Sequence, residues 1–140
     1  MNTLAHHFGL EGITAFSGGM EDTAFNYRMV DALKGLGFPL KEIIGGDNPK
    51  YVMEGLNMDS HFYFSKAYDH EINPQFGYIA LMVCDHADEN CPVVLGMKYR
   101  IPLRYKDPKE FDNTEKESKA YQDKVKEIGR EMYYILSRIK

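Results

Sequence analysis

The only two cysteines of the chain, Cys84 and Cys91, stand seven positions apart in the segment VCDHADENCP (83–92), at the end of the apolar run YIALMV (78–83). A disulfide requires two Cα atoms about 4.4–6.8 Å apart. Seven extended residue steps would span more than ~20 Å. The polar and small residues between the cysteines must therefore curl before the two thiols can react with each other.

Three interpretations of these thiols remain open from their spacing. They can be two buried or half-buried thiols that never react, or a redox pair that forms a reversible disulfide. They can also belong to a metal site, for which closed zinc coordination needs four ligands. Its members would be Cys84, His86, Cys91 and either His61 or His70. Because the local sequence supplies only three of the four, we expect no metal and no cofactor.

A carboxylate, Asp107, follows the second apolar run, YRIPLRY (99–105), and directly precedes Pro108. An aspartate before a proline is usually a turn residue. Its place beyond a predicted strand also makes it a candidate general acid. In open α/β sheets, ligands bind beyond the carboxyl ends of the strands. Cys84 and Asp107 are therefore expected at neighbouring strand ends, on the same side of the molecule.

The sequence lacks the usual cradles for a phosphate-like anion. A Cys-x5-Arg loop would combine a thiolate nucleophile with backbone N–H groups and a guanidinium. The residues six positions after Cys84 and Cys91 are Asn90 and Met97, and neither is arginine. No Walker loop or GxGxxG motif is present, and SGG (17–19) is too short to count as one.

Apolar residues at helical spacing predict the helices that position these groups. The first covers about 1–9 and stops at Gly9, and the second runs from Asn26, as its N-cap, to Gly37. A third, long helix follows the capping-box pattern Thr114-x-x-Glu117. Its apolar face comprises Tyr121, Val125, Ile128, Met132, Ile135 and Ile139.

Five segments are predicted to form strands. GITAFSGG (12–19) is typical of a short strand ended by two glycines, and residues 51–53 and 61–64 flank a polar link as in a hairpin. YIALMV (78–83) does not alternate, which fits a strand buried on both faces, as in a parallel sheet. The strand 99–105 contains Pro102, which favours a sheet edge. The order of elements predicts an α/β fold.

Length and composition indicate one soluble globular domain over 1–140. Hydrophobic residues make up 44% and charged residues 27% of the sequence. A formal net charge of −4 argues against a nucleic-acid partner, which needs a basic face, but leaves room for a small anionic substrate. No signal peptide is visible, and the longest apolar stretch is too short to cross a bilayer. We therefore expect a cytoplasmic protein without a membrane partner.

From about Leu4 to Ile139 the sequence resembles the low-molecular-weight protein tyrosine phosphatase superfamily, and most closely its thioredoxin-coupled arsenate reductase branch. The matching segments are FSGG (16–19), the helix start at Asn26, VCDHADENCP (83–92), KDP (106–108) with the Thr-Glu-rich helix start after it, and IGREMYYIL (128–136). The resemblance implies a three-layer fold, with a mostly parallel sheet flanked by helices and carrying an inserted β-hairpin. It also implies a small oxyanion or phosphotyrosine as substrate, and thioredoxin as a partner of the reductase branch.

The resemblance assigns roles to four residues. Cys84 corresponds to the first resolving thiol and Cys91 to the second, which relay oxidation away from the nucleophile. Asp107 matches the general acid, a catalytic position, and Ser17 matches a serine that braces the anion-binding loop on the substrate-binding side. The implied reaction is thiolate attack on a tetrahedral oxyanion.

The chain departs from the family pattern at its start. The family has a strand, the Cys-x5-Arg loop and then a helix, whereas this sequence begins within that helix and contains neither the nucleophile nor its arginine. Three explanations are open: a natural chain that starts further upstream, a catalytically inactive relative, or a homo-oligomer that completes an exposed sheet edge. We therefore expect a phosphatase-like or arsenate reductase-like protein that is inactive in this form. The alternative is a non-catalytic redox or binding module that uses a Cys84–Cys91 disulfide.

Overall fold

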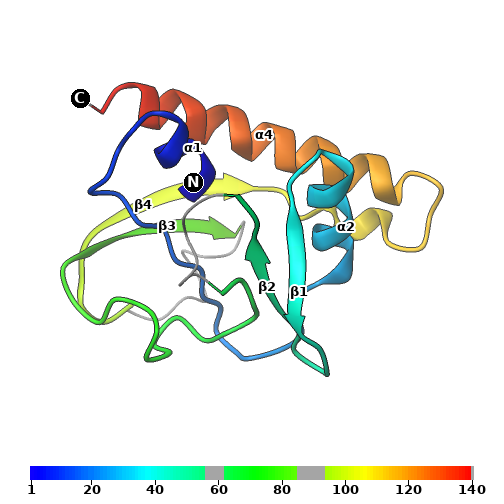
Figure 1. The fold of residues 1–140 in the computed structure, drawn as a ribbon, viewed down its shortest axis with the longest axis horizontal. Coiled ribbons are helices and arrows are strands. Elements are labelled where there is room, and N and C mark those ends of the chain that lie inside the picture. Colours follow the sequence, from blue (N-terminus) through cyan, green and yellow to red (C-terminus); the bar gives the residue numbers. More distant parts are fainter. Residues whose placement is uncertain (56–61, 85–93, 140) are drawn as a thin grey trace. The chain divides into compact units, whose positions relative to one another are not determined.

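The computed structural model describes residues 1–55, 62–84 and 94–139 (Figure 1). The elements are α1 (Asn2–His7), α2 (Tyr27–Gly35), β1 (Leu40–Ile44), β2 (Lys50–Met53), β3 (Tyr78–Cys84), β4 (Met97–Tyr105), the 3-10 helix η1 (Pro108–Phe111) and α4 (Glu117–Ser137). None of the helices in the described part has both the length and the apolar character that a membrane span requires.

The chain forms two compact units. Unit 1 comprises residues 1–15, 24–64 and 111–140, and unit 2 comprises residues 16–23 and 65–110. Unit 1 holds the described α-helices and the β1–β2 pair, and unit 2 holds the β3–β4 pair.

The strands of the described residues pair in two separate two-stranded sheets. β1 and β2 are antiparallel, with Leu40 opposite Met53. β3 and β4 are parallel, with Ile79 opposite Tyr99. The mixed α/β class predicted from the sequence is confirmed, while the three-layer arrangement stays a prediction.

β3 differs from the buried strand that the sequence predicts. Met82 is buried, but Ile79 is 57% exposed and Val83 is 46% exposed. A continuous apolar run therefore does not mean burial on both faces here. β4 pairs with β3 alone among the described strands, and it carries Pro102 in register with Met82, as expected of an edge strand.

The predicted hairpin uses a different pair of strands. β1, which the sequence analysis missed, joins β2 through the residues GGDNP (45–49), a segment rich in turn-forming residues. Part of the predicted pairing is nevertheless present, because Tyr51 and Tyr63 exchange two backbone hydrogen bonds of 2.9 and 2.8 Å in an isolated antiparallel bridge. The linking residues 56–61 lie outside the described residues.

The prediction of a strand over 12–19 is wrong. The side chain of Asn2 takes both backbone groups of Ala15: its amide donates to the carbonyl at 2.9 Å and its oxygen accepts from the N–H at 2.7 Å. The N–H and carbonyl groups of Ala15 are therefore not available for hydrogen bonds with a neighbouring strand. Only Gly19 makes an isolated parallel bridge, to Ala67.

α1 ends, and α2 begins and ends, as the sequence predicts. α1 is followed by Gly9 at φ +66°. In α2, the Asn26 side chain accepts a hydrogen bond from the N–H of Arg28 at 3.0 Å, and Gly37 follows the helix at φ +88°. The N-cap of α2 and the left-handed glycines after α1 and α2 are therefore as expected.

The start of α4 replaces the predicted capping box by a different set of bonds. Thr114 Oγ1 accepts from the N–H of Lys116 at 3.3 Å, and the Glu117 carboxylate accepts from the N–H of Asn113 at 2.6 Å. Glu117 also accepts from Nε of Arg28 at 2.7 Å. The capping box fails because the Glu117 carboxylate bonds Asn113 and Arg28.

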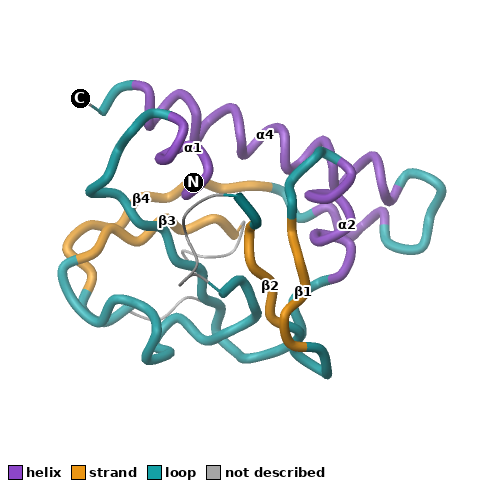
Figure 2. The backbone as a smooth tube through the Cα atoms, in the orientation of Figure 1, coloured by secondary structure: helices purple, strands orange, loops and turns teal. Residues whose placement is uncertain are grey.

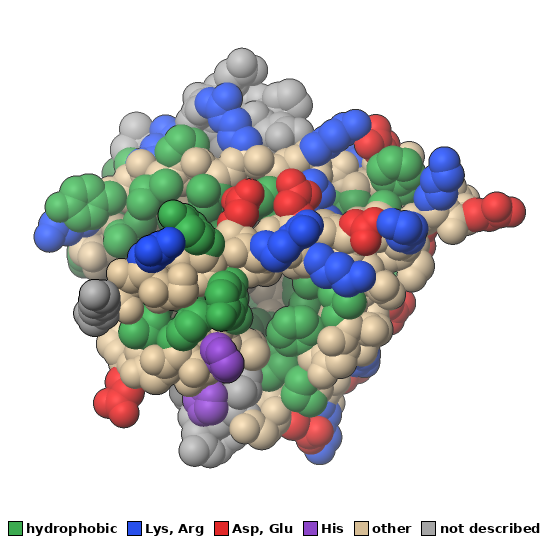
Figure 3. Space-filling model, turned by 90° about the horizontal axis from the view of Figure 1, so that it is seen from above, with side chains coloured by type: hydrophobic (Ala, Val, Ile, Leu, Met, Phe, Trp, Pro, Cys, Tyr) green, Lys and Arg blue, Asp and Glu red, His purple; other side chains and the backbone are tan. Residues whose placement is uncertain are grey.

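The long helix α4 has a buried and a charged side. Its buried residues are Tyr121, Met132 and Leu136. On its exposed side, Lys119 pairs with Asp123, one turn along the helix. The face of the molecule drawn in Figure 3 carries acidic and basic side chains interspersed, with no large field of one sign.

The bonds of Glu117 make the stability of unit 1 depend on pH. The hydrogen bond from Arg28 and that from the Asn113 N–H hold the pKa of Glu117 below its ordinary value of 4.5. Their stabilisation is therefore present above pH 4.5 and is lost as the pH falls through the lowered folded-state pKa. We expect Glu117→Gln to reduce the urea midpoint at neutral pH and to have much less effect in acid.

The control for this prediction is Glu115→Gln, two positions earlier on the exposed surface. We expect that variant to follow the wild-type pH profile of the urea midpoint. Equal losses in the two variants at neutral pH would show that the Arg28–Glu117 contact does not stabilise the fold.

Candidate functional site

Cys84 and Asp107 come from neighbouring ends of the parallel strands in unit 2. Cys84 is the last residue of β3, and its Cα pairs with that of Tyr105, the last residue of β4. Asp107 follows Tyr105 by two positions. Because ligands of open α/β sheets bind beyond the carboxyl ends of strands, this edge is the natural place for a reacting group.

Asp107 lies exposed at the start of η1. Its Oδ1 accepts a hydrogen bond from the backbone N–H of Lys109 at 3.0 Å, which is the bond of a residue that caps a first helical turn. Within the described residues, nothing donates a hydrogen bond to the other carboxylate oxygen. The predicted turn role is therefore observed, and the second oxygen remains accessible to a ligand.

The relay predicted for the two cysteines lies largely outside the described residues. The backbone of Cys84 ends β3, whereas its side chain and the whole of Cys91, in the range 85–93, lie outside the described part of the chain. The inert, redox and metal-binding interpretations of the pair all remain predictions.

Most residues of the predicted metal site also lie outside the described ranges. His61, His86 and Cys91 lie outside the described residues. His70 is described, and its Nδ1 accepts a hydrogen bond from the N–H of Ile72 at 3.2 Å, within a local turn. The described ranges contain no group of three or more His, Cys, Asp or Glu side chains that could hold a metal ion.

Ser17 lies in a loop that is anchored by backbone pairing to a second loop of unit 2. The Gly19 N–H donates to the Lys66 carbonyl and the Tyr68 N–H donates to the Gly19 carbonyl, each at 2.9 Å. At Gly18, a Cβ atom would lie 2.4 Å from the Cα of Tyr68, so only glycine permits this approach. The two glycines predicted to end a strand instead make close backbone contacts with the loop at 66–68, and these contacts position Ser17.

Lys66, which no sequence motif singles out, is only 4% exposed. Its Nζ donates to Ser17 Oγ at 3.4 Å, and burial lowers the pKa of this lysine. Its neighbours in the sequence, SKAY, are those of an ordinary surface loop, so the local pattern carries no signal of burial. An ammonium group beside an exposed hydroxyl is an arrangement that can bind an anion.

Asn73 ties the same two loops together. Its Nδ2 donates to the carbonyl oxygens of Ser17 at 3.2 Å, Ala67 at 3.2 Å and Tyr68 at 3.0 Å. Its Oδ1 is buried and has no hydrogen-bond partner among the described residues. An unpaired buried acceptor costs ~1–3 kcal/mol, so a donor that reached this oxygen would be stabilising.

No protein-family model matches this chain, and no curated protein matches it either. The resemblance described above therefore depends on the sequence motifs themselves.

Proposed function

We propose that this chain carries the thiol relay and the general acid of a low-molecular-weight phosphatase-like or arsenate reductase-like protein. The reaction begins when the thiolate of a Cys-x5-Arg loop attacks a tetrahedral oxyanion. In a phosphatase, this step forms a phospho-cysteine while Asp107 gives its proton to the leaving oxygen. Small oxyanions and phosphotyrosine are the corresponding substrates.

In the reductase form, the relay consists of two thiol exchanges. The Cys84 thiolate attacks the sulfur of the arsenic–cysteine adduct, so arsenic leaves with two electrons and a disulfide joins the nucleophile to Cys84. The Cys91 thiolate then attacks the sulfur of Cys84 and releases the nucleophile as a thiolate. Thioredoxin, a dithiol, reduces the resulting Cys84–Cys91 disulfide and is itself oxidised.

The observation that supports this proposal most is the placement of Cys84 and Asp107 at adjacent carboxyl ends of the parallel pair β3–β4. A thiol and an accessible carboxylate at this edge are what the acid and the first relay step require. The hydrogen-bonded pair of Ser17 and Lys66 adds an anion-binding group within the same unit.

The nucleophile must come from outside these 140 residues, because they contain no Cys-x5-Arg sequence. We expect the purified chain to show no measurable hydrolysis of p-nitrophenyl phosphate and no reduction of arsenate by thioredoxin. The reference is the double variant Cys84→Ser/Cys91→Ser, assayed under the same conditions. Turnover by the wild type above that reference would contradict the assignment of roles.

The lack of a nucleophile loop also favours a second function, a non-catalytic redox or binding module. Such a module would switch between the dithiol and the Cys84–Cys91 disulfide without any oxyanion. A disulfide that forms and reopens in glutathione mixtures resembling those of the cytosol favours the module. A disulfide that withstands those mixtures and opens only with thioredoxin favours the relay.

A further inference from the structure

Unit 2 contains a cavity at the opposite end of the β3–β4 pair from Cys84. Its volume is about 230 Å³, and it is lined by Tyr68, Asp69, Pro74, Gln75, Phe76, Tyr78 and Leu95. Tyr78 is the first residue of β3 and Leu95 precedes β4, so the cavity lies at the amino-terminal ends of these strands. The tube in Figure 2 shows that the chain leading into β3 is a loop. The cavity is separate from the strand ends that carry the proposed relay.

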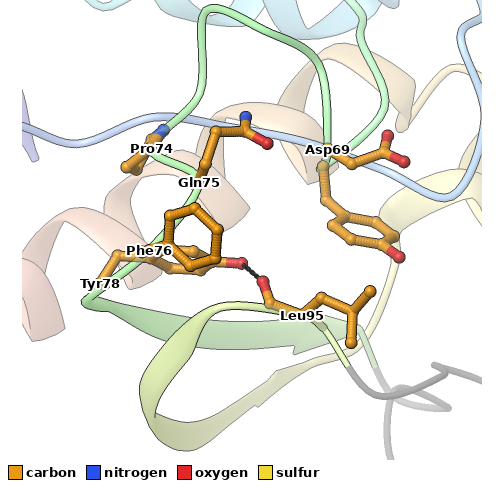
Figure 4. Close-up of a pocket in the computed structure, with 7 residues that line it drawn as sticks. Asp69, Pro74, Gln75, Phe76, Tyr78 and Leu95 are labelled. Atoms are coloured by element: carbon orange, nitrogen blue, oxygen red, sulfur yellow. Dashed lines mark hydrogen bonds between the residues drawn. The ribbon is translucent and has the colours of Figure 1, made fainter.

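The walls of the cavity are aromatic, and the labelled residues surround it in Figure 4. Tyr68, Phe76 and Tyr78 contribute three rings. The Tyr78 hydroxyl donates to the Leu95 carbonyl at 2.7 Å, which fixes one wall. Phe76 is 85% exposed and Leu95 is 73% exposed. Both side chains are therefore accessible to a ligand that enters the cavity.

Asp69 and Gln75 supply hydrogen-bond acceptors to the cavity. Asp69 is exposed and makes no hydrogen bond or ion pair with any described residue. Gln75 uses its Nε2 to donate to the carbonyl oxygens of His70 at 3.2 Å and Asn73 at 2.9 Å, which leaves its Oε1 as an acceptor. In Figure 4, the Gln75 amide extends toward the side of the cavity on which Asp69 lies.

The charge and shape of the cavity select the class of ligand. Among the described residues, its lining contains a carboxylate and no lysine, arginine or histidine, so an anion is disfavoured and a cation is favoured. Aromatic faces attract organic cations through their quadrupoles, and quaternary ammonium groups are bound in this way by rings around a small pocket. A cavity of about 230 Å³ is smaller than the ~300–1,000 Å³ of sites for drug-sized ligands, so the ligand is a small head group.

We propose that this cavity binds a small quaternary ammonium cation, with its methyl groups against the rings of Tyr68, Phe76 and Tyr78 and its charge near Asp69. This site is independent of the proposed relay.

The test titrates the ¹⁵N-labelled full chain with choline and follows backbone amide shifts by NMR. The matched probe is 3,3-dimethylbutan-1-ol, which has the shape of choline but carries no charge. We expect choline to shift the amides of Tyr68, Asp69, Phe76 and Tyr78 in a saturable way. The neutral alcohol should bind at least about fivefold more weakly, since it lacks the cation–π attraction.

Two variants locate the binding. Phe76→Ala and Asp69→Asn should each weaken choline binding by about threefold or more, and both residues are exposed, so the fold should persist. The control Tyr134→Ala removes an aromatic residue that is 61% exposed on α4 and should leave binding unchanged. The absence of saturable shifts, equal binding of the neutral alcohol, or unchanged binding in both variants would overturn the proposal.

Discussion

Gly96→Ala is expected to cause the largest loss of stability among alanine substitutions at the glycines of this chain. A Cβ atom at Gly96 would lie 1.9 Å from the carbonyl oxygen of Gln75, and the residue has φ +83°. The obstacle is backbone, which cannot rotate away as a side chain would. The clash and the left-handed backbone together should cost roughly 3 kcal/mol or more of the free energy of unfolding.

Alanine substitutions at two other glycines separate the cost of the steric clash from the cost of the left-handed backbone. Gly37 has φ +88° but open space around it, so Gly37→Ala measures the backbone conformation alone, about 1 kcal/mol. Gly12 has neither a positive φ nor a near neighbour, so Gly12→Ala should stay within about 0.5 kcal/mol of the wild type. The free energies come from urea denaturation followed by circular dichroism. Losses at Gly96 no larger than those at Gly37 would show that the contact between Gly96 and Gln75 is not as described.

Loss of either thiol is expected to abolish the intramolecular disulfide. After oxidation, the wild-type chain is mixed with thioredoxin, thioredoxin reductase and NADPH. We expect one NADPH to be consumed for each disulfide that thioredoxin reduces, which is one per chain. The variants Cys84→Ser and Cys91→Ser each keep one thiol, so neither can form the internal disulfide. Any disulfide in those variants must join two chains or bind glutathione, and non-reducing electrophoresis and mass measurement distinguish the two.

NADPH consumption equal to that of the fully reduced chain would contradict the proposal that thioredoxin is a partner. Formation of internal disulfide in either single-thiol variant is chemically impossible, so these variants also calibrate the assay. Glu115→Gln, on the exposed surface, is expected to behave as the wild type does.

The features that the sequence predicts correctly have local causes. Asn26 and Gly37 act within one turn of α2, and the placement of Cys84 and Asp107 follows from the ends of two apolar runs. The Asp107 turn likewise depends only on its next neighbours in the chain. Short-range hydrogen bonds and continuous apolar runs are sufficient to predict each of these features.

The features that the sequence does not reveal depend on distant residues. The segment around Ala15 has a strand-like composition, but Asn2 takes its backbone hydrogen bonds. Lys66 is buried because unit 2 folds around it, with the Ser17 loop among its contacts. The four or five residues next to it in the sequence do not predict this burial. The aromatic cavity likewise combines residues before β3 with Leu95, which precedes β4.

The most direct test of the relay is the mass of one peptide. Trypsin leaves Cys84 and Cys91 together in residues 67–98, because no lysine or arginine stands between Lys66 and Lys98. The folded chain is equilibrated with oxidised glutathione, blocked with iodoacetamide, digested and weighed. We expect a peptide lighter by two hydrogens than the unblocked dithiol. When thioredoxin treatment precedes the blocking step, we expect two blocked thiols. Two blocked thiols at every glutathione ratio, or glutathione adducts alone, would contradict it.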